Sequence, residues 1–446
     1  METTLGLVPL VRSTFDVALA SQVIDQVRSQ LEGAGFSLTG PAKWVSDMAD
    51  ADAVARRLAD DPPDLLLVLQ ATFADSTMVT ALAQAVDAPL LLWAVPEART
   101  GGRLRLNSLC GINLAAHGLK RRGLPYDYVY AAPDDAAAME KVRVLSDAGR
   151  VRRLLRRARV GRVGENPDGF ESCKLDTEAL QDRFGVEIVQ LHLPEIFDSV
   201  KETPDAEVDT LLESLRRRLA DLDALDQEAL RRTLGTYLTL RRYADQENLH
   251  GLAVRCWPEF FTELGCAACG AMSMLSDELI PCSCEADVNG TVTQLILQWL
   301  SGGPAFGTDM VSFEIEDDLA VIWHCGLAPL AMADPEFEAR GTIHSNRQLP
   351  LLMEFPLKPG RVTIARLSEA AGDGRYQLVM GSGEMVRAPM SFTGTSGVLR
   401  FDNGAQAALD TIMENGLEHH ISLTYGDHMP ALLALAKLLE LPVVRL

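Results

Sequence analysis

The sequence lacks the features that define several other classes of protein. No apolar run approaches the roughly 18 consecutive residues of a membrane span, and charged residues at Glu2, Arg12 and Asp16 interrupt the N-terminal stretch, unlike a secretory signal. Only 8 of the 446 residues are cysteine, too few for a disulfide-stabilised scaffold. We therefore expect a cytoplasmic protein with free thiols and no membrane partner.

Positive charge is also scarce. Lys and Arg number 41 against 62 Asp and Glu, which gives a net charge of −21. Such a field repels polyanions, so we expect no nucleic-acid partner. We interpret the basic segment Arg150–Arg162 as a solvated helix face that joins two domains. A small anionic ligand can still bind in a local positive pocket.

Two common catalytic motifs are missing. The sequence contains no P-loop and no G-x-G-x-x-G fingerprint, so it does not indicate a nucleotide cofactor. It also contains no G-x-S-x-G elbow, because GTSGV at Gly394–Val398 has the wrong spacing. An α/β hydrolase is therefore a weak candidate.

The first part of the chain has an α/β pattern. The apolar runs Leu5–Val11, Asp64–Leu69 and Pro89–Val95 suit buried parallel strands, and Val17–Leu31 and Met78–Val86 have helical periodicity. In such sheets ligands bind beyond the carboxyl ends of the strands. The polar side chains that follow these strands are candidate substrate contacts: Arg12, Thr14, Asp16, Gln70, Thr72, Asn107 and Ser108.

In the rest of the chain, the pattern of predicted elements changes near Ala339. Before it, Val160–Val163 and Val186–Leu193 are strand-like and flank a helix; after it, short Val-, Leu- and Thr-rich segments alternate with turns, including Gly372–Gly374 and Gly381–Gly383. We predict an α/β fold with two Rossmann-like parallel-sheet domains followed by a mainly antiparallel β C-terminal domain. The predicted boundaries are 1–155, 156–335 and 336–446.

Ionisable residues gather in two distant stretches. Glu285 precedes an apolar helix, Asp309 and His324 follow within the same region, and His419 and His420 form a pair near the C-terminus. Carboxylates and imidazoles on separate loops are suitable ligands for Mn²⁺ or a similar divalent ion. The spacing alone is equally compatible with loop or capping carboxylates and with histidines packed in the core.

The cysteines form a second candidate metal site. Cys266, Cys269, Cys282 and Cys284 include a C-x-x-C and a C-x-C, from which a tetrahedral zinc site can be drawn. The intervening sequence, however, is rich in Ala and Met and has the character of a packed helix. Free cysteine is also one of the most buried residue types, so core packing is the competing interpretation.

Several motifs together resemble the L-fucose isomerase and L-arabinose isomerase superfamily. They are CEADVNGTVTQLILQWLSG, Asp309, WHCG, HSNR at His344–Arg347, and GLEHHISLTYGDH. The resemblance is strongest over Arg255–Leu446 and looser in the N-terminal half, through RSTFD, QATF and PEARTGGRLRLNSLCG. The pattern is similar to the fucose isomerase-like branch, because arabinose isomerases carry Glu in place of Asp309.

The resemblance implies a metal-dependent aldose–ketose isomerase. Glu285 matches the carboxylate that binds metal and moves a proton, Asp309 matches its partner across the substrate, and His420 matches the metal-binding histidine. His324 corresponds to a histidine that arabinose isomerases use at the metal; we place it among the substrate contacts, and its role as a metal ligand stays open. The reaction passes through a cis-enediol, with Mn²⁺ or another divalent metal polarising the sugar oxygens.

The resemblance also implies a homo-oligomer, a trimer or hexamer in which the first domain of one subunit completes the site of its neighbour. His344, Asn346 and Arg347 are further candidate substrate contacts. Arg12 and Arg347 suit an anionic group, so the sugar substrate is expected to be deoxy or otherwise modified, with a phosphate or sulfonate as an option. The alternative function is a non-catalytic sugar-binding or regulatory protein that keeps the isomerase fold.

Overall fold

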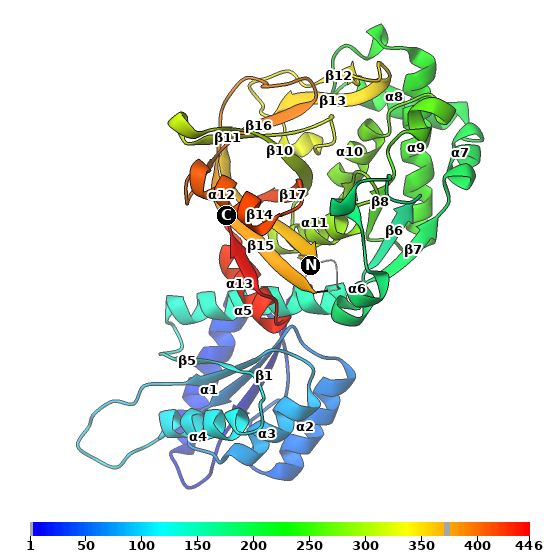
Figure 1. Cartoon of the computed structure of the whole chain (residues 1–446). Coiled ribbons are helices and arrows are strands. Elements are labelled where there is room, and N and C mark those ends of the chain that lie inside the picture. Colours follow the sequence, from blue (N-terminus) through cyan, green and yellow to red (C-terminus); the bar gives the residue numbers. More distant parts are fainter. Residues whose placement is uncertain (1–2, 370–374) are drawn as a thin grey trace. The chain divides into compact units, whose positions relative to one another are not determined.

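The computed structural model describes residues 3–369 and 375–446 (Figure 1). The chain divides into two compact units, Met1–Arg153 and Leu154–Leu446, and each unit has a hydrophobic core of its own. Among the described residues, no helix has both the length and the apolar character needed to cross a membrane. The division into three domains stays a prediction.

The first unit is built on a five-stranded parallel sheet in the order β2-β1-β3-β4-β5. Its central strands are buried on both faces, as expected of a parallel sheet covered by helices. The strands are β1 (Thr4–Leu10), β2 (Ser37–Thr39), β3 (Leu65–Gln70), β4 (Leu90–Ala94) and β5 (Asp127–Tyr130). The helices are α1 (Val17–Gly33), α2 (Met48–Asp60), α3 (Ser76–Ala85), α4 (Ser108–Lys120) and α5 (Ala136–Leu155).

The second unit begins with a four-stranded parallel sheet in the order β7-β6-β8-β9. Its strands are β6 (Arg159–Val163), β7 (Glu187–Leu191), β8 (Gly251–Val254) and β9 (Cys282–Ser283). The helices of this part are α6 (Thr177–Phe184), α7 (Leu193–Lys201), α8 (Asp205–Leu215), α9 (Gln227–Gln246), α10 (Cys269–Asp277) and α11 (Val288–Ser301). Both predicted parallel-sheet α/β regions are thus confirmed.

A nine-stranded, mainly antiparallel sheet completes the second unit. Strands β16-β11-β10-β17-β14-β15 pair in turn, and β15 pairs back to β16, so this part closes into a barrel. The strands are β10 (Phe306–Glu314), β11 (Leu319–His324), β12 (Arg340–Ile343), β13 (Pro350–Pro356), β14 (Gly360–Glu369), β15 (Tyr376–Val386), β16 (Thr395–Phe401), β17 (His420–Tyr425) and β18 (Val443–Arg445). Helices α12 (Ala405–Asn415) and α13 (Met429–Leu438) accompany it. This confirms the predicted antiparallel C-terminal part.

One predicted turn is wrong. Gly381–Gly383 lies inside β15 and pairs with β14 instead of ending a strand. Gly383 serves the closure of the barrel, because a Cβ at this position would lie only 2.2 Å from the carbonyl oxygen of Arg400 on β16. Another predicted turn, Gly372–Gly374, lies outside the described residues.

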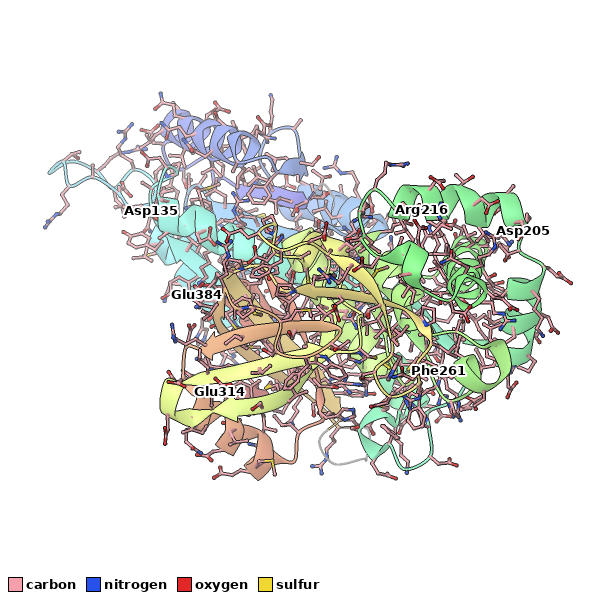
Figure 2. The ribbon with its side chains drawn as sticks, turned by 90° about the horizontal axis from the view of Figure 1, so that it is seen from above. Asp135, Asp205, Arg216, Phe261, Glu314 and Glu384 are labelled. Carbon is pink, nitrogen blue, oxygen red and sulfur yellow. The ribbon has the colours of Figure 1, made fainter. Side chains whose placement is uncertain are left out.

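Charged side chains cover the surface of the second unit. Those of Asp205, Arg216 and Glu384 project outward from their elements (Figure 2). Arg216, for example, contacts Asp223 at 2.6 Å while remaining 37% exposed. Exposed ion pairs of this kind add at most about 1 kcal/mol each, so the stability of the unit depends mainly on its apolar core.

Candidate active site

Three neighbouring parallel strands of the second unit deliver polar residues to one sheet edge. Asn166 follows β6, Trp257 follows β8, and Glu285 follows β9, all at the carboxyl ends of strands. This is the edge where open parallel sheets bind their ligands. The position of Glu285 thus follows from the strand order of the sheet.

The backbone at Glu285 is held in an uncommon conformation. Glu285 and Ala286 both have left-handed φ values, 60° and 54°, which costs a non-glycine residue about 1–2 kcal/mol. The side-chain amide of Asn166 donates to both of their carbonyl oxygens, at 3.0 and 3.1 Å. The amide of Ala286 also donates to the carbonyl of Val254, at 3.0 Å. These hydrogen bonds fix the loop that presents Glu285.

Asp309 and His420 come from the barrel. Asp309 on β10 lies directly opposite His420 on β17 in the antiparallel register, which places their side chains on the same face. Nε2 of His420 lies 3.6 Å from Oδ1 of Asp309 and 3.8 Å from Oε2 of Glu285. Two carboxylates, 111 and 135 positions before His420 in the numbering, thereby meet at its imidazole.

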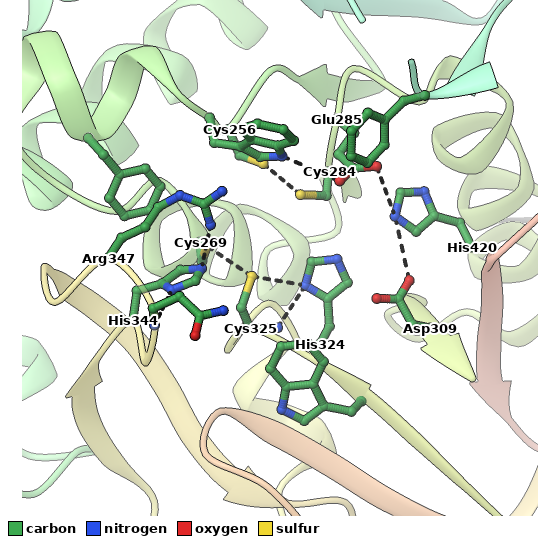
Figure 3. Close-up of a pocket in the computed structure, with 15 residues that line it drawn as sticks. Cys256, Cys269, Cys284, Glu285, Asp309, His324, Cys325, His344, Arg347 and His420 are labelled. Atoms are coloured by element: carbon green, nitrogen blue, oxygen red, sulfur yellow. Dashed lines mark hydrogen bonds and ion pairs between the residues drawn. The ribbon is translucent and has the colours of Figure 1, made fainter. Parts of the chain in front are cut away.

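The three side chains line a single cavity of about 400 Å³ (Figure 3). Of the other predicted residues, His324, His344, Asn346 and Arg347 line the same cavity. Arg347 and His344 lie on one side of it, and Asp309 and His420 lie on the other. The remaining lining residues are Phe170, Cys256, Trp257, Phe261, Cys269, Cys284, Trp323 and Cys325.

Glu285 is a charged group in a largely buried position. Trp257 donates its indole N–H to Oε1 at 3.3 Å, and Nε2 of His419 lies 3.4 Å from Oε2. Burial raises the pKa of this carboxyl, but the hydrogen bond to His419 and the charges of both histidines outweigh burial and lower it. Glu285 is therefore ionised near neutral pH and can accept a proton.

The donor set fits a divalent metal ion. His420 belongs to three groups of side chains whose ligand atoms lie within 4.8 Å of one another: Cys173–Asp287–His420, Glu285–His419–His420 and Asp309–His324–His420. Oδ1 of Asp309 is buried and has no hydrogen-bond partner among the described residues. A buried acceptor without a donor, facing an imidazole nitrogen, is suited to a cation.

The first of these groups is the least suitable for a metal. Oδ2 of Asp287 already contacts Nη1 of Arg366 at 2.5 Å and Nδ1 of His420 at 3.0 Å. Burial, followed by the charges of Asp287 and Glu285, raises the pKa of the Cys173 thiol beyond the physiological range, so this sulfur keeps its proton. The other two groups reach His420 from the cavity side.

His324 and His420 differ in the partner of Nδ1. Nδ1 of His324 lies 2.9 Å from the backbone N–H of Cys325, which donates to it. In a neutral imidazole the proton then resides on Nε2. In this form His324 offers the cavity a hydrogen-bond donor, which suits a sugar oxygen better than a metal.

Arg347 marks the opposite end of the cavity. Its guanidinium lies over the rings of Trp257 and Phe261, 5.0 and 5.1 Å from their centroids, and Nη1 lies 3.3 Å from Nε2 of His344. Burial and the adjacent Arg347 lower the pKa of His344 to about 4, so it is neutral at pH 7. Within the part of the chain that the structure describes, no carboxylate pairs with Arg347.

The cysteines are all free thiols. Cys266 and Cys282 are fully buried, and burial raises the pKa of Cys266 to about 12. Across residues 3–369 and 375–446, no group able to hold a metal combines the cysteines of the predicted zinc set. Cys284 instead contacts Cys256, with the two Sγ atoms 2.6 Å apart. Core packing therefore accounts for Cys266 and Cys282.

The remaining predicted contacts belong to the first unit, where they lie at or after the carboxyl ends of β1, β3 and β4. The backbone N–H of Arg12 donates to Oγ1 of Thr72 at 2.8 Å, and its guanidinium pairs with Asp75 at 2.6 Å. The hydroxyl of Ser108 donates to the carbonyl of Gln70.

The other first-unit candidates have local partners or none. Asp16 caps α1 and pairs with Arg105 at 2.9 Å, the backbone N–H of Asn107 donates to Glu97 at 2.9 Å, and Thr14 is exposed. The side-chain amide of Gln70 is buried without a partner among the described residues. Gln70 thus has hydrogen-bonding capacity that its own surroundings do not use.

Sequence reasoning assigned no site role to four neighbours of the catalytic candidates: Asn166, Cys173, Asp287 and Arg366. The motif containing Glu285 also contains Asp287, whose role as helix cap was recognisable from its position before α11. Arg366 lies in the middle of β14 and carries no local signal. Its significance depends on a contact with Asp287, 79 positions away.

Comparisons with known proteins agree with the site. The N-terminal domain model of fucose/sulfoquinovose isomerases matches residues 6–156, and the C-terminal domain model of L-fucose isomerase matches residues 324–446. Sulfoquinovose isomerase from Alkalicoccus urumqiensis is 32% identical and covers 99% of both chains. Sulfoquinovose isomerase from Priestia aryabhattai is 31% identical and covers 98% of both.

Solved structures add little by comparison. An ABC transporter solute-binding protein from Burkholderia multivorans matches 66% of this chain and 92% of its own, with 14% identity and a TM-score of 0.20. A similarity this low carries no argument.

The sequence relatives span the whole chain, and the chain therefore belongs to the L-fucose isomerase family and is an aldose–ketose isomerase.

Proposed function

We propose that this isomerase is metal-dependent and converts an aldose that carries a sulfonate, at the end remote from its carbonyl, into the corresponding ketose. The observation that carries the proposal is one cavity with Glu285, Asp309 and His420 on one side and Arg347 on the other. The substrate class agrees with the relatives, which are named sulfoquinovose isomerase.

Glu285, Asp309 and Nε2 of His420 would hold the metal, with Mn²⁺ as the proposed ion. The unpartnered Oδ1 of Asp309 and the position of Nε2 between two carboxylates support this choice. When bound, the ion supplies Lewis acidity to the sugar oxygens at the reacting carbons. Oxygen ligands with one imidazole suit Mn²⁺ and related ions.

Glu285 and Asp309 divide the proton transfers. Isomerisation removes a proton from the carbon next to the carbonyl and returns it to the former carbonyl carbon through a cis-enediol. Glu285 is ionised and is steered by the indole of Trp257, which suits it to accept the proton. Asp309 then moves the proton between the two oxygen atoms of the cis-enediol. Nε2 of His324 donates a hydrogen bond to the sugar.

Arg347 recognises the anionic group. It is the sole Lys or Arg among the fifteen described side chains that line the cavity, so the site favours a singly charged anion over a doubly charged one. Packing on Trp257 and Phe261 fixes the plane of the guanidinium, which favours bidentate hydrogen bonds to oxygen atoms. These features support sulfonate over phosphate.

The loops of the first unit contribute to the site of a neighbouring subunit in a trimer or hexamer. Support comes from family membership and from the position of these residues at the carboxyl ends of the strands of a parallel sheet, where such sheets bind their ligands. Arg12, Thr14, Asp16, Gln70, Thr72, Asn107 and Ser108 would contact the sugar in this arrangement.

The direct test is an assay of ketose formation. The protein is incubated with sulfonated, phosphorylated and neutral aldoses of the same configuration, with and without Mn²⁺. We expect a ketose from the sulfonated aldose, with activity dependent on the metal. A non-catalytic sugar-binding protein would bind the sugars and form no ketose, and preference for the neutral sugar would contradict the role of Arg347.

A further inference from the structure

A buried ion pair lies behind the Nδ1 edge of His420. Asp287 and Arg366 have side chains that are 1% and 2% exposed, and their nearest atoms are 2.5 Å apart. Oδ2 of Asp287, which receives this contact, also lies 3.0 Å from Nδ1 of His420. The proposed function leaves this pair without a role, since neither residue lines the cavity.

Every partner of the Asp287 carboxylate can be assigned as a donor. Oδ1 accepts the backbone N–H of Gly290 at 2.9 Å, and Oδ2 accepts Nη1 of Arg366. A guanidinium group and a backbone N–H group cannot accept a hydrogen bond, so the carboxylate acts as an acceptor toward them. Nδ1 of His420, 3.0 Å from the same oxygen, must then carry the proton, because two acceptors would repel each other.

We propose that Asp287 and Arg366 are positioning residues that hold His420 in its Nδ1–H tautomer. The lone pair of Nε2 then faces Glu285 and Asp309, where a metal ion can use it. The inference rests on the proposed function for the identity of the metal site. It does not depend on which sugar the enzyme converts.

The cost of this arrangement supports a role beyond stability. A buried ion pair stabilises a fold little once desolvation is counted. The pair also imposes glycine on the first turn of α11, because a Cβ at Gly290 would lie 2.6 Å from Oδ2 of Asp287 and 3.1 Å from Nη1 of Arg366. Glycine inside a helix is itself unfavourable by about 0.5–1 kcal/mol relative to alanine.

His324 provides an internal contrast in the same cavity. Its Nδ1 accepts the backbone N–H of Cys325, so its neutral form carries the proton on Nε2. The two imidazoles, whose ring centroids are 6.0 Å apart, thus have opposite tautomers fixed by opposite Nδ1 partners. His420 is thereby assigned as the metal ligand and His324 as the hydrogen-bond donor.

Nitrogen-15 NMR of the histidine rings in the metal-free protein, recorded at a pH high enough for the imidazoles to be neutral, tests the tautomer directly. We expect Nδ1–H for His420 and Nε2–H for His324 in the unaltered protein. Asp287→Asn combined with Arg366→Met removes both charges of this pair together; Glu418, whose Oε1 lies 4.0 Å from Nε of Arg366, keeps the hydrogen bond from the backbone N–H of Glu369. The amide of the new Asn faces Nδ1 with a donor while its carbonyl caps α11, so His420 should shift to Nε2–H.

Mn²⁺ binding, measured by electron paramagnetic resonance without sugar, provides the second readout. We expect the double variant to bind Mn²⁺ about 10–100-fold more weakly, the usual effect of losing such a partner. Asp226→Asn is the matched control, because Asp226 caps α9 in the same way and lies outside the cavity. It should leave Mn²⁺ affinity and both tautomers unchanged.

Each other outcome has a defined meaning. An unchanged His420 tautomer or unchanged Mn²⁺ affinity in a folded double variant overturns the proposal, as does failure of the unaltered protein to bind Mn²⁺. If the double variant does not fold, the single variant Asp287→Asn, whose amide faces Nδ1 with a donor, must shift His420 to Nε2–H and weaken Mn²⁺ binding; an unchanged tautomer or affinity in that variant also overturns the proposal. A protein that binds Mn²⁺ as expected but forms no ketose refutes the proposed function and leaves this inference standing.

Discussion

At the residue scale, Glu285 combines a strained backbone, an ionised carboxylate and contacts from Trp257 and His419. Replacing it by Gln keeps the shape of the side chain and removes its ability to take a proton. We expect Glu285→Gln to lower kcat at least about 100-fold, the lower range for loss of a positioned acid or base. Circular dichroism should show an unchanged fold.

The control for this variant is Glu263→Gln, at an exposed position outside the cavity. It should retain full activity. A Glu285→Gln enzyme that keeps most of its turnover would remove Glu285 from the proton transfer.

Arg347 determines a different property, the choice of substrate. Loss of a hydrogen bond to a charged group costs about 1.5–3 kcal/mol, which corresponds to about 10–100-fold. We expect Arg347→Met to lower kcat/KM by this factor for the sulfonated aldose and to leave the slow reaction of the neutral aldose unchanged. Arg217→Met, at an exposed position, is the control. Equal losses on both sugars would indicate a structural role instead.

His344 gives the protein a specific pH dependence. Its pKa is about 4 in the folded state against an ordinary value of 6.5, because burial and Arg347 disfavour its charged form. The unfolded chain therefore binds more protons between these values, and stability falls as the pH drops from 6.5 toward 4. The shift corresponds to at most about 3 kcal/mol.

Urea denaturation at pH 7 and pH 4.5 measures this contribution. The His344→Asn variant should lose less stability between the two pH values than the unaltered protein does. An identical loss in both proteins would show that His344 does not titrate as its surroundings suggest.

At the element scale, the start of α11 joins the barrel to the parallel sheet of the second unit. Asp287 caps the helix, and Gly290 allows Arg366 of β14 to reach Asp287. Gly290→Ala should therefore destabilise the protein despite the better helix propensity of alanine, by about 1–3 kcal/mol as in other overpacked sites.

Gly33→Ala, at the end of α1 where a Cβ meets no atom within 4 Å, is the control and should be neutral or slightly stabilising. Thermal unfolding distinguishes the two variants. A Gly290→Ala protein as stable as the unaltered one would show that α11 shifts to relieve the contact.

The sequence sufficed to predict elements with a clear period. Val17–Leu31 was expected as a helix and α1 spans Val17–Gly33, while the apolar runs of the first unit form buried parallel strands. Gly381–Gly383 was misread because a glycine that allows barrel closure has the same local pattern as a turn. Local composition does not reveal which strand will cross nearby.

The candidate site was predictable only in part, for a related reason. Glu285, Asp309 and His420 were identified through motifs, and the structure brings them to one imidazole. Asn166 and Arg366 were missed because their roles come from contacts 119 and 79 positions away. No periodicity or spacing encodes such contacts.

At the scale of the whole molecule, the predicted assembly requires the first unit of one subunit to act on the site of another. Mixing two inactive variants tests this. Glu285→Gln and Arg12→Ala subunits, denatured and refolded together, should recover part of the activity, because some sites then receive both unaltered parts. Light scattering should show a trimer or hexamer. A monomer, or no recovery on mixing, would contradict the prediction.

The most direct measurement for the whole account is anomalous diffraction from a crystal soaked in Mn²⁺. We expect one strong peak in the cavity, bonded to Glu285, Asp309 and Nε2 of His420, with Asp287 retaining its contact with Nδ1. A peak bonded to Cys173 and Asp287, or no peak near His420, would contradict the account.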